Sequence, residues 1–528
     1  MNFWRKPQWS TAQSGVVQSG VIQSGVIQSG VVPSGVVLIA AFALTAWFVC
    51  DRPALLISSD TLFPAEFVWD LLHHDNAWSG FEQPHIPSFF PDLAVFGPVQ
   101  TLTGNWRAGF AAWVFVALTW LVLILRQIIG QIAGIDAEAA TRPALAALLP
   151  IAAAAAPVKA IFPFLFVLLP YTHGGSLLLA LSAAVITSPG CRWPPEARML
   201  ALVPLCFAAA LSDQLFAGYF LVPATLALGG QVLTRAIGGP IALRLIAGAW
   251  SGAVLGLVCV EGLDRQIMLF PPLAELPLRY GRFFLALPQT PAMAVTLGVF
   301  ALSISVEAWR RGWRGFIAGF WPVFALVSSL GSLSLTILLY EDIWSWRYAL
   351  PLLWWSVTMG ATLTARASFP MASPISGRAV AAGFALICLV MGPRVPRLFH
   401  WNAPLATCLR DAGLRTGLAD FWVARATSAA SDWQLQIQQI DSHGAARIWG
   451  NNRFWFTRDI HDGAQRPEYR FVVLDGLPET RIAAAYGAPD RVMMCGTVRV
   501  WIYNDPDQVY ANLRRASPSM EPVFASGP

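Results

Sequence analysis

Carboxylates and aromatic residues alternate in the segment 52–107. Asp60 stands in the run Ser58-Ser59-Asp60-Thr61, and Asp92 ends the run Pro87-Ser88-Phe89-Phe90-Pro91-Asp92. A carboxylate held near low dielectric can accept the proton of a bound alcohol. We therefore predict Asp60 and Asp92 as catalytic residues, with Asp60 as the general base. The alternative for each is a helix N-cap, Asp60 for a helix over 61–72 and Asp92 for one over 93–103.

Polar groups also stand at the edges of apolar runs. Charges at a membrane boundary are costly to place, which makes them functional candidates. Arg347 is suited to hold a phosphate, because a planar guanidinium binds two phosphate oxygens at once. It could instead extend to the membrane interface or pair with Glu341 or Asp342. The further candidates are Lys159, His173 in Thr172-His173-Gly174-Gly175, and Asp213 in Ser212-Asp213-Gln214.

Long apolar runs must position these residues. The 528 residues are 56% hydrophobic and 12% charged, against roughly 25% charged in a soluble domain. Runs of about 20 residues cross a bilayer as helices, so we predict a polytopic α-helical membrane protein with about eleven transmembrane helices. The predicted spans are 35–51, 108–126, 144–172, 174–188, 199–212, 215–234, 245–260, 290–306, 317–339, 348–365 and 379–393. The run 144–172 is overlong and proline-rich, so it is either a kinked span or a span with a re-entrant piece.

Charge predicts the orientation of the spans. Short cytoplasmic loops collect Lys and Arg, which favours a cytoplasmic N-terminus and places the long loop 52–107 outside. In a bacterial cell this is the periplasmic face of the inner membrane. Residues 1–34 hold a pentapeptide repeat and form a low-complexity leader into the membrane domain, 35–393.

Charged residues return after Arg394, where helical and strand-like patterns alternate. The helical patterns are 403–429, 478–486 and 507–516, and the apolar runs are 469–474 and 498–503. We predict a soluble periplasmic α/β domain over 394–528. It holds two of the seven cysteines, Cys408 and Cys495, and in an oxidising compartment we expect a disulfide between them. The alternative is two free buried thiols.

Several classes of function are excluded. A net charge of +5 from scattered residues is no footprint for nucleic acid, which we exclude as a partner. The short cytoplasmic loops contain no Walker loop or nucleotide-binding glycine fingerprint. A donor that reaches an outer site without a nucleotide must be carried by the membrane lipids.

The pattern resembles the polytopic glycosyltransferases of the GT-C fold, which include protein O-mannosyltransferases and the aminoarabinose transferase of lipid A. The resemblance rests on an Asp after the first span, the acidic first loop, the Thr-His-Gly-Gly and Ser-Asp turns, the pair Arg347-Tyr348, and the C-terminal domain. It implies a polyprenyl-phosphate sugar donor, an envelope glycan, lipid or protein acceptor, and an inverting single displacement. Asp60 then takes the acceptor proton and Asp92 orients the acceptor or a metal.

The same resemblance implies that Arg347 and Tyr348 hold the departing phosphate, with Lys159 and His173 as helpers. The carboxylates Asp213, Glu341 and Asp342 stand at the boundaries of apolar runs on the outer side, so we expect them to line the substrate site. No cofactor is assigned, and a divalent metal at the site is left as an alternative. The rival functions are a lipid-linked glycan polymerase, a flippase or transporter of the cell envelope, and a noncatalytic scaffold. A transporter should show inverted repeats or charges at mid-membrane.

Overall fold

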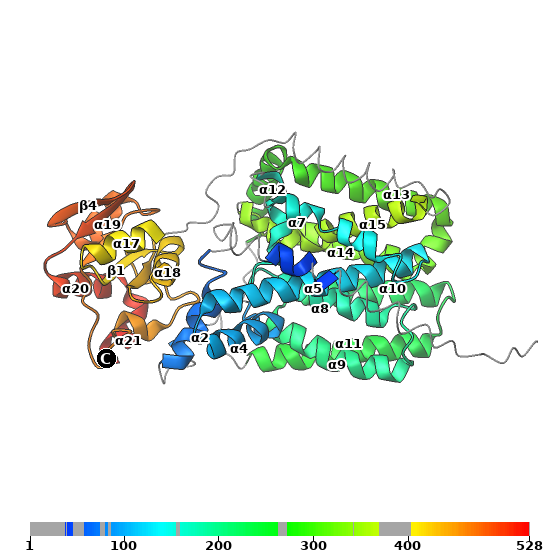
Figure 1. Ribbon diagram of the computed structural model, residues 1–528, viewed down its shortest axis with the longest axis horizontal. Helices are drawn as coiled ribbons and strands as arrows, with labels where there is room; N and C mark the ends of the chain where they lie inside the picture. Colours follow the sequence, from blue (N-terminus) through cyan, green and yellow to red (C-terminus); the bar gives the residue numbers. More distant parts are fainter. Residues whose placement is uncertain are drawn as a thin grey trace, which may run out of the picture.

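The computed structural model describes residues 37–38, 40–45, 58–73, 80–82, 86–154, 159–261, 272–341, 343–368 and 403–526. The predicted leader 1–34, the predicted span 379–393 and Asp342 lie outside these residues. A body of apolar helices joins a C-terminal sheet domain, with α2 (Phe63–His73) between them (Figure 1).

Five described helices are long and apolar enough to cross a membrane. They are α5 (Trp106–Ala133), α9 (Pro195–Ser212), α11 (Gly239–Glu261), α13 (Pro291–Ala318) and α14 (Phe320–Leu338). Shorter apolar helices are α8 (Gly174–Thr187) and the pair η4 (Ala217–Leu221) and α10 (Val222–Leu233), and α15 (Leu350–Ser368) packs on α13 and α14. The chain is thus a helical membrane protein, but the prediction of about eleven spans is not confirmed.

The predicted span over 144–172 is a series of short helical pieces. They are α6 (Thr141–Ala146), α7 (Leu149–Ala154) and η3 (Lys159–Val167). Pro143 lies inside α6 and Pro163 inside η3. A proline removes a main-chain donor and clashes with the preceding turn, so apolar composition alone overestimated the helix here.

Helices α9 and α11 lie side by side (Figure 1), and a glycine stripe on α11 permits their close approach. A Cβ at Gly252 would lie 2.1 Å from the carbonyl oxygen of Val203, and one at Gly256 would lie 2.5 Å from that of Phe207. Small residues at a spacing of four allow helix backbones to pack closely in membranes. The stripe therefore fixes which face of α11 meets α9.

A buried charge cluster joins three helices near the carboxyl ends of α5 and α15. Glu307 of α13 accepts a hydrogen bond from Arg366 of α15 (Nη1 to Oε2, 2.7 Å) and is also paired with Arg311. Arg366 in turn donates to the carbonyl oxygen of Ile132 in α5. The carboxylate is buried, so these bonds compensate its desolvation.

The first loop folds against the helical body. It contains α2, η2 (Phe89–Leu93) and α4 (Ala94–Thr103) before α5 begins. Asn105 caps α5 by accepting the amide hydrogen of Arg107 (2.9 Å). Gln100 of α4 donates to the carbonyl oxygen of Ala65 in α2 (2.9 Å). These contacts hold the described parts of the loop against one end of the helices.

The C-terminal domain has a mixed five-stranded sheet in the order β2-β1-β3-β5-β4. The first three strands in that order pair in parallel, whereas β5 is antiparallel to both β3 and β4. The strands are β1 (Thr416–Asp420), β2 (Gln436–Ile440), β3 (Phe471–Val473), β4 (Arg491–Cys495) and β5 (Val498–Ile502).

Helices cover both faces of this sheet. The helices are α17 (Ala403–Asp411), α18 (Phe421–Ala430), α19 (Glu479–Tyr486), α20 (Pro506–Ala516) and α21 (Glu521–Ser526). Two buried clusters form the core, one containing Leu409 and Ile437, and the other Trp501 and Leu513. The expected disulfide is present between Cys408 of α17 and Cys495 of β4, with their Cα atoms 5.8 Å apart.

Candidate active site

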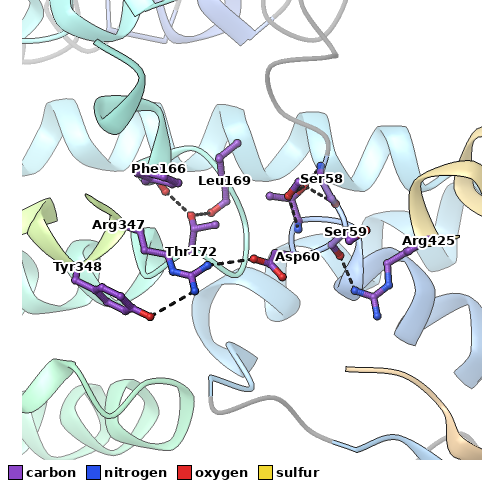
Figure 2. Close-up of polar contacts among 10 residues, drawn as sticks. Ser58, Ser59, Asp60, Phe166, Leu169, Thr172, Arg347, Tyr348 and Arg425 are labelled. Carbon is purple, nitrogen blue, oxygen red and sulfur yellow. Dashed lines mark hydrogen bonds and ion pairs between the residues drawn. The ribbon is translucent and has the colours of Figure 1, made fainter. Parts of the chain in front are cut away.

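Asp60 and Arg347 form an ion pair at the end of the helical body (Figure 2). Arg347 Nη1 donates to Asp60 Oδ2 at 3.1 Å, and the side chains are 24% and 8% exposed. The other carboxylate oxygen, Oδ1, and the Nε of Arg347 are buried without a hydrogen-bond partner among the described residues. The Asp60 side chain therefore does not cap α2. A half-satisfied pair of this kind keeps bonding capacity for a ligand.

Tyr348 extends this pair toward a second one. Its hydroxyl accepts from Arg347 Nη2 at 3.4 Å, and its ring lies 5.2 Å from that of His173. His173 Nδ1 and Asp213 Oδ2 are 2.8 Å apart, with side chains 0% and 2% exposed. As a carboxylate, Asp213 accepts, so the hydrogen lies on Nδ1. The Nε2 of His173 has no partner among the described residues.

Local backbone geometry explains the position of His173. It precedes α8 with a φ of 68°, a left-handed conformation that is uncommon outside glycine. Gly174 follows, and a Cβ there would lie 2.6 Å from the carbonyl oxygen of Val167. Thr172 closes the turn by hydrogen bonding to the carbonyl oxygens of Phe166 and Leu169, both at 2.7 Å. The Thr-His-Gly-Gly sequence thus forms a turn that holds the imidazole inward.

Tyr219 of η4 contacts the main chain at Arg347 and was not predicted from the sequence. Its hydroxyl lies 3.4 Å from the carbonyl oxygens of both Arg347 and Tyr348. Ser328 of α14 donates to the carbonyl oxygen of Tyr219 at 3.2 Å. A single tyrosine inside the apolar run 215–234 was the signal available in the sequence, since a buried hydroxyl requires a partner.

Asp92 joins the first loop to the turn before α8. Its Oδ1 accepts from the main-chain nitrogen of Tyr171 at 3.0 Å, and a Cβ on Gly175 would lie 2.0 Å from its Oδ2. Burial raises the pKa of Asp92 to about 7, although the hydrogen bond from Tyr171 opposes the shift. These contacts make Asp92 a structural link between the first loop and α8, and its predicted catalytic role stays a prediction.

Of the remaining predicted residues, Glu341 lies apart from this network. Glu341 is exposed and pairs with Arg279 of α12 (Leu276–Ala286) at 3.3 Å. Lys159 begins η3, but its side chain lies outside the described part of the structure, as does all of Asp342. The alternative pairing of Arg347 with Glu341 is therefore replaced by the pairing with Asp60.

Arg425 of α18 is a further buried residue beside the site that the sequence did not reveal (Figure 2). It pairs with Glu66 of α2 and donates to the carbonyl oxygen of Ser59 at 2.5 Å. Burial raises the pKa of Glu66 to about 7, against the lowering effect of Arg425. The sequence signal was an arginine within the small, apolar run Phe421–Ala430.

Within the described residues, no group of three or more His, Cys, Asp or Glu side chains could hold a metal ion. No protein-family model matches the chain, and comparison with curated proteins finds no match either.

Proposed function

We propose that the protein is a membrane glycosyltransferase that moves a sugar from a polyprenyl-phosphate donor to an acceptor hydroxyl at the periplasmic face. The observation that carries the proposal is the Asp60–Arg347 pair at 3.1 Å. Asp60, a proton acceptor, and Arg347, a side chain that can bind phosphate, are distant in sequence but lie in contact at one end of the apolar helices. An amphiphilic donor within the bilayer could reach a site placed there.

The pair provides the two groups that an inverting displacement needs. The acceptor oxygen attacks the anomeric carbon while the bond from that carbon to the phosphate oxygen breaks. The hydroxyl proton passes to Asp60, and Arg347 stabilises the charge that develops on the leaving polyprenyl phosphate. The two side chains are in contact in the unliganded protein. A donor phosphate on the guanidinium would compete with Asp60 for Arg347 and so release the carboxylate to act as a base.

The second pair would contact the sugar when donor binding opens the site, because both side chains are buried in the unliganded protein. His173 is fixed by Asp213, and its Nε2 has no partner among the described residues. When the imidazole is neutral, this nitrogen accepts a hydrogen bond, as a sugar hydroxyl can provide. Tyr348 lies between the two pairs, so one bound donor could engage both.

The C-terminal domain supports the proposed orientation. It contacts the first loop through buried hydrogen bonds such as Arg425 to Ser59 and Asn452 Nδ2 to Asp70 Oδ2 (2.6 Å). Two extramembrane parts in direct contact lie on one side of the bilayer. The Cys408–Cys495 disulfide favours the oxidising side, which in a bacterium is the periplasm.

Mass spectrometry of cell-envelope glycans tests the function. Cells lacking the protein should lose one sugar modification, wild-type protein should restore it, and Asp60→Asn should not. The matched control is Asp432→Asn, which alters an exposed ion pair with Arg107 and should restore the modification fully. Identical glycans with and without the protein would reject the proposal.

A further inference from the structure

Helix α18 of the C-terminal domain contacts the chain beside both members of the Asp60–Arg347 pair. The carbonyl oxygen of Phe421, its first residue, accepts from Ser59 Oγ at 2.5 Å. The ring of Trp422 stacks on Trp344, with centroids 5.7 Å apart and planes inclined by 19°. Ser59 directly precedes Asp60, and Trp344 lies one turn before Arg347 in η7 (Ile343–Ala349). One helix end therefore touches both halves of the site.

Arg425 strengthens the contact on the Asp60 side. Its guanidinium donates to the carbonyl oxygens of Ser59 and Gly450 and pairs with Glu66. The whole side chain is buried. Three acceptors around one planar guanidinium fix its orientation, which the point charge of a lysine would not do. The turn over 59–62, which carries Asp60, is thus held by a side chain 366 positions away from Ser59.

Further contacts between the two parts involve α2 and α5. Asp70 receives hydrogen bonds from Asn452 and from Trp455 Nε1, at 2.6 and 2.9 Å. Arg107 of α5 pairs with Asp432 at 2.6 Å, but both side chains are largely exposed. These contacts attach the domain to α2 and α5, whereas α18 contacts the segments that carry Asp60 and Arg347.

We propose that α18 is the positioning element of the site, in which Phe421, Trp422 and Arg425 set the spacing between Asp60 and Arg347. The proposal rests on the proposed function of that pair and makes the C-terminal domain a part of the transferase site. The three residues act through Ser59 and Trp344, so they are positioning residues. Misplacement of a reacting group by about 1 Å can lower a rate by about 10², so small movements of α18 should be visible in turnover.

Hydrogen exchange on the full-length protein tests the positioning without any substrate. Arg425→Gln should increase amide exchange in 58–62, where Leu62 donates to the carbonyl oxygen of Ser58 at 3.0 Å. Trp422→Ala should increase exchange in 343–349. Asp432→Asn, the matched control in the same domain, should leave both segments as in the wild type. Unchanged exchange in both variants would overturn the proposal.

Kinetics then separate positioning from a merely structural role. Trp422→Ala should lower kcat at least tenfold, while the KM of the acceptor changes less than threefold. Trp422→Phe keeps a stacking ring and should therefore recover most of the rate. Wild-type kcat in both Trp422→Ala and Arg425→Gln overturns the proposal. Should Arg425→Gln fail to fold, Trp422→Ala decides alone, because Trp422 is only half-buried.

The two proposals fail in different ways. Direct binding of polyprenyl phosphate, measured without a sugar, should be at least tenfold weaker in Trp422→Ala than in Asp432→Asn. If the wild type transfers no sugar and binds no polyprenyl phosphate, yet exchange rises as expected in the variants, the proposed function is rejected and the positioning by α18 stands.

Discussion

Arg347 Nη1 lies 3.1 Å from Asp60 Oδ2 although 287 positions separate the two residues in the sequence. The contact joins the start of the first loop to the segment that enters α15. It is incomplete on both sides, because Asp60 Oδ1 and Arg347 Nε have no hydrogen-bond partner among the described residues. A purely structural ion pair gains most when its remaining groups are satisfied, so the open groups favour a ligand-binding role.

Asp60→Asn should lower the transfer rate by about 10² to 10⁴, the usual contribution of a general base. The amide keeps the volume of the side chain and can still accept from Arg347, so expression and thermal stability should stay near those of the wild type. Turnover of the purified variant is the measurement. Near-wild-type turnover in Asp60→Asn together with an inactive Asp92→Asn would move the base to Asp92.

Arg347→Lys should weaken binding of polyprenyl phosphate about tenfold or more. Lysine keeps the charge but loses the planar fork that contacts Asp60 and Tyr348 and that could hold two phosphate oxygens. Isothermal titration with polyprenyl phosphate measures the loss. Arg279→Lys is the matched control, since Arg279 pairs only with the exposed Glu275 and Glu341 among the described acidic residues. Equal affinity in both variants would remove Arg347 from the phosphate site.

The meeting of Asp60, Arg347, His173 and Asp213 could be expected from the sequence because each stands at the end of an apolar run on the side that charge assigns to the periplasm. The hydrogen-bond partner of each side chain could not be predicted from the sequence. The resemblance assigned His173 to the donor phosphate, and nothing in the local sequence indicated that its Nδ1 pairs with Asp213. Side-chain pairing depends on rotamers and on how helices pack, and neither is encoded in local spacing.

Arg425 and β1 show where local sequence patterns fail. The partners of Arg425, Glu66 and Ser59, lie more than 350 positions away, as the separations of 359 and 366 show, so no local signal reveals them. The run 403–429 was expected to be helical throughout, but β1 (Thr416–Asp420) interrupts it. A short strand covered on both faces lacks alternation, and periodicity alone cannot separate it from a buried helix.

The stability of the protein should depend on pH through Asp92. Burial raises its pKa from 3.8 to about 7, so the folded protein binds this proton more tightly than the unfolded chain. The stabilisation is complete below about pH 4 and is lost as the pH rises through 7. The loss is on the order of 4 kcal/mol at full ionisation, from about 1.4 kcal/mol per pKa unit.

Asp92→Asn isolates this effect because asparagine stays neutral and still accepts from Tyr171. Its thermal midpoint in detergent should change less between pH 4 and pH 8 than that of the wild type, and the two curves should diverge as the pH rises. Parallel curves over this range would contradict the raised pKa.

Gly252→Ala should separate α9 from α11. The new Cβ would lie 2.1 Å from the carbonyl oxygen of Val203, which is main chain and cannot rotate away. Overpacking of this kind typically costs about 1 to 3 kcal/mol, and the thermal midpoint of the detergent-solubilised protein should fall accordingly. Gly298→Ala in α13 is the control, since nothing lies within 4 Å of its Cβ position. An unchanged midpoint in Gly252→Ala would show that the helices are farther apart than described.

Replacing Cys408 and Cys495 by serine should destabilise the C-terminal domain and, through α18, loosen the Asp60 turn. The disulfide closes a loop with a sequence separation of 87, and such bonds typically contribute roughly 2 to 4 kcal/mol by restricting the unfolded chain. Helix α17, which carries Cys408, packs on α18, so its release should raise hydrogen exchange in α18 and in 58–62.

Maleimide labelling under denaturing conditions tests whether the Cys408–Cys495 bond exists. Two more thiols should react after reduction than before, and this difference should be absent in the double variant. Full labelling of the wild type without reductant would show that the bond is absent in the cell and would remove one support for the periplasmic placement of the domain.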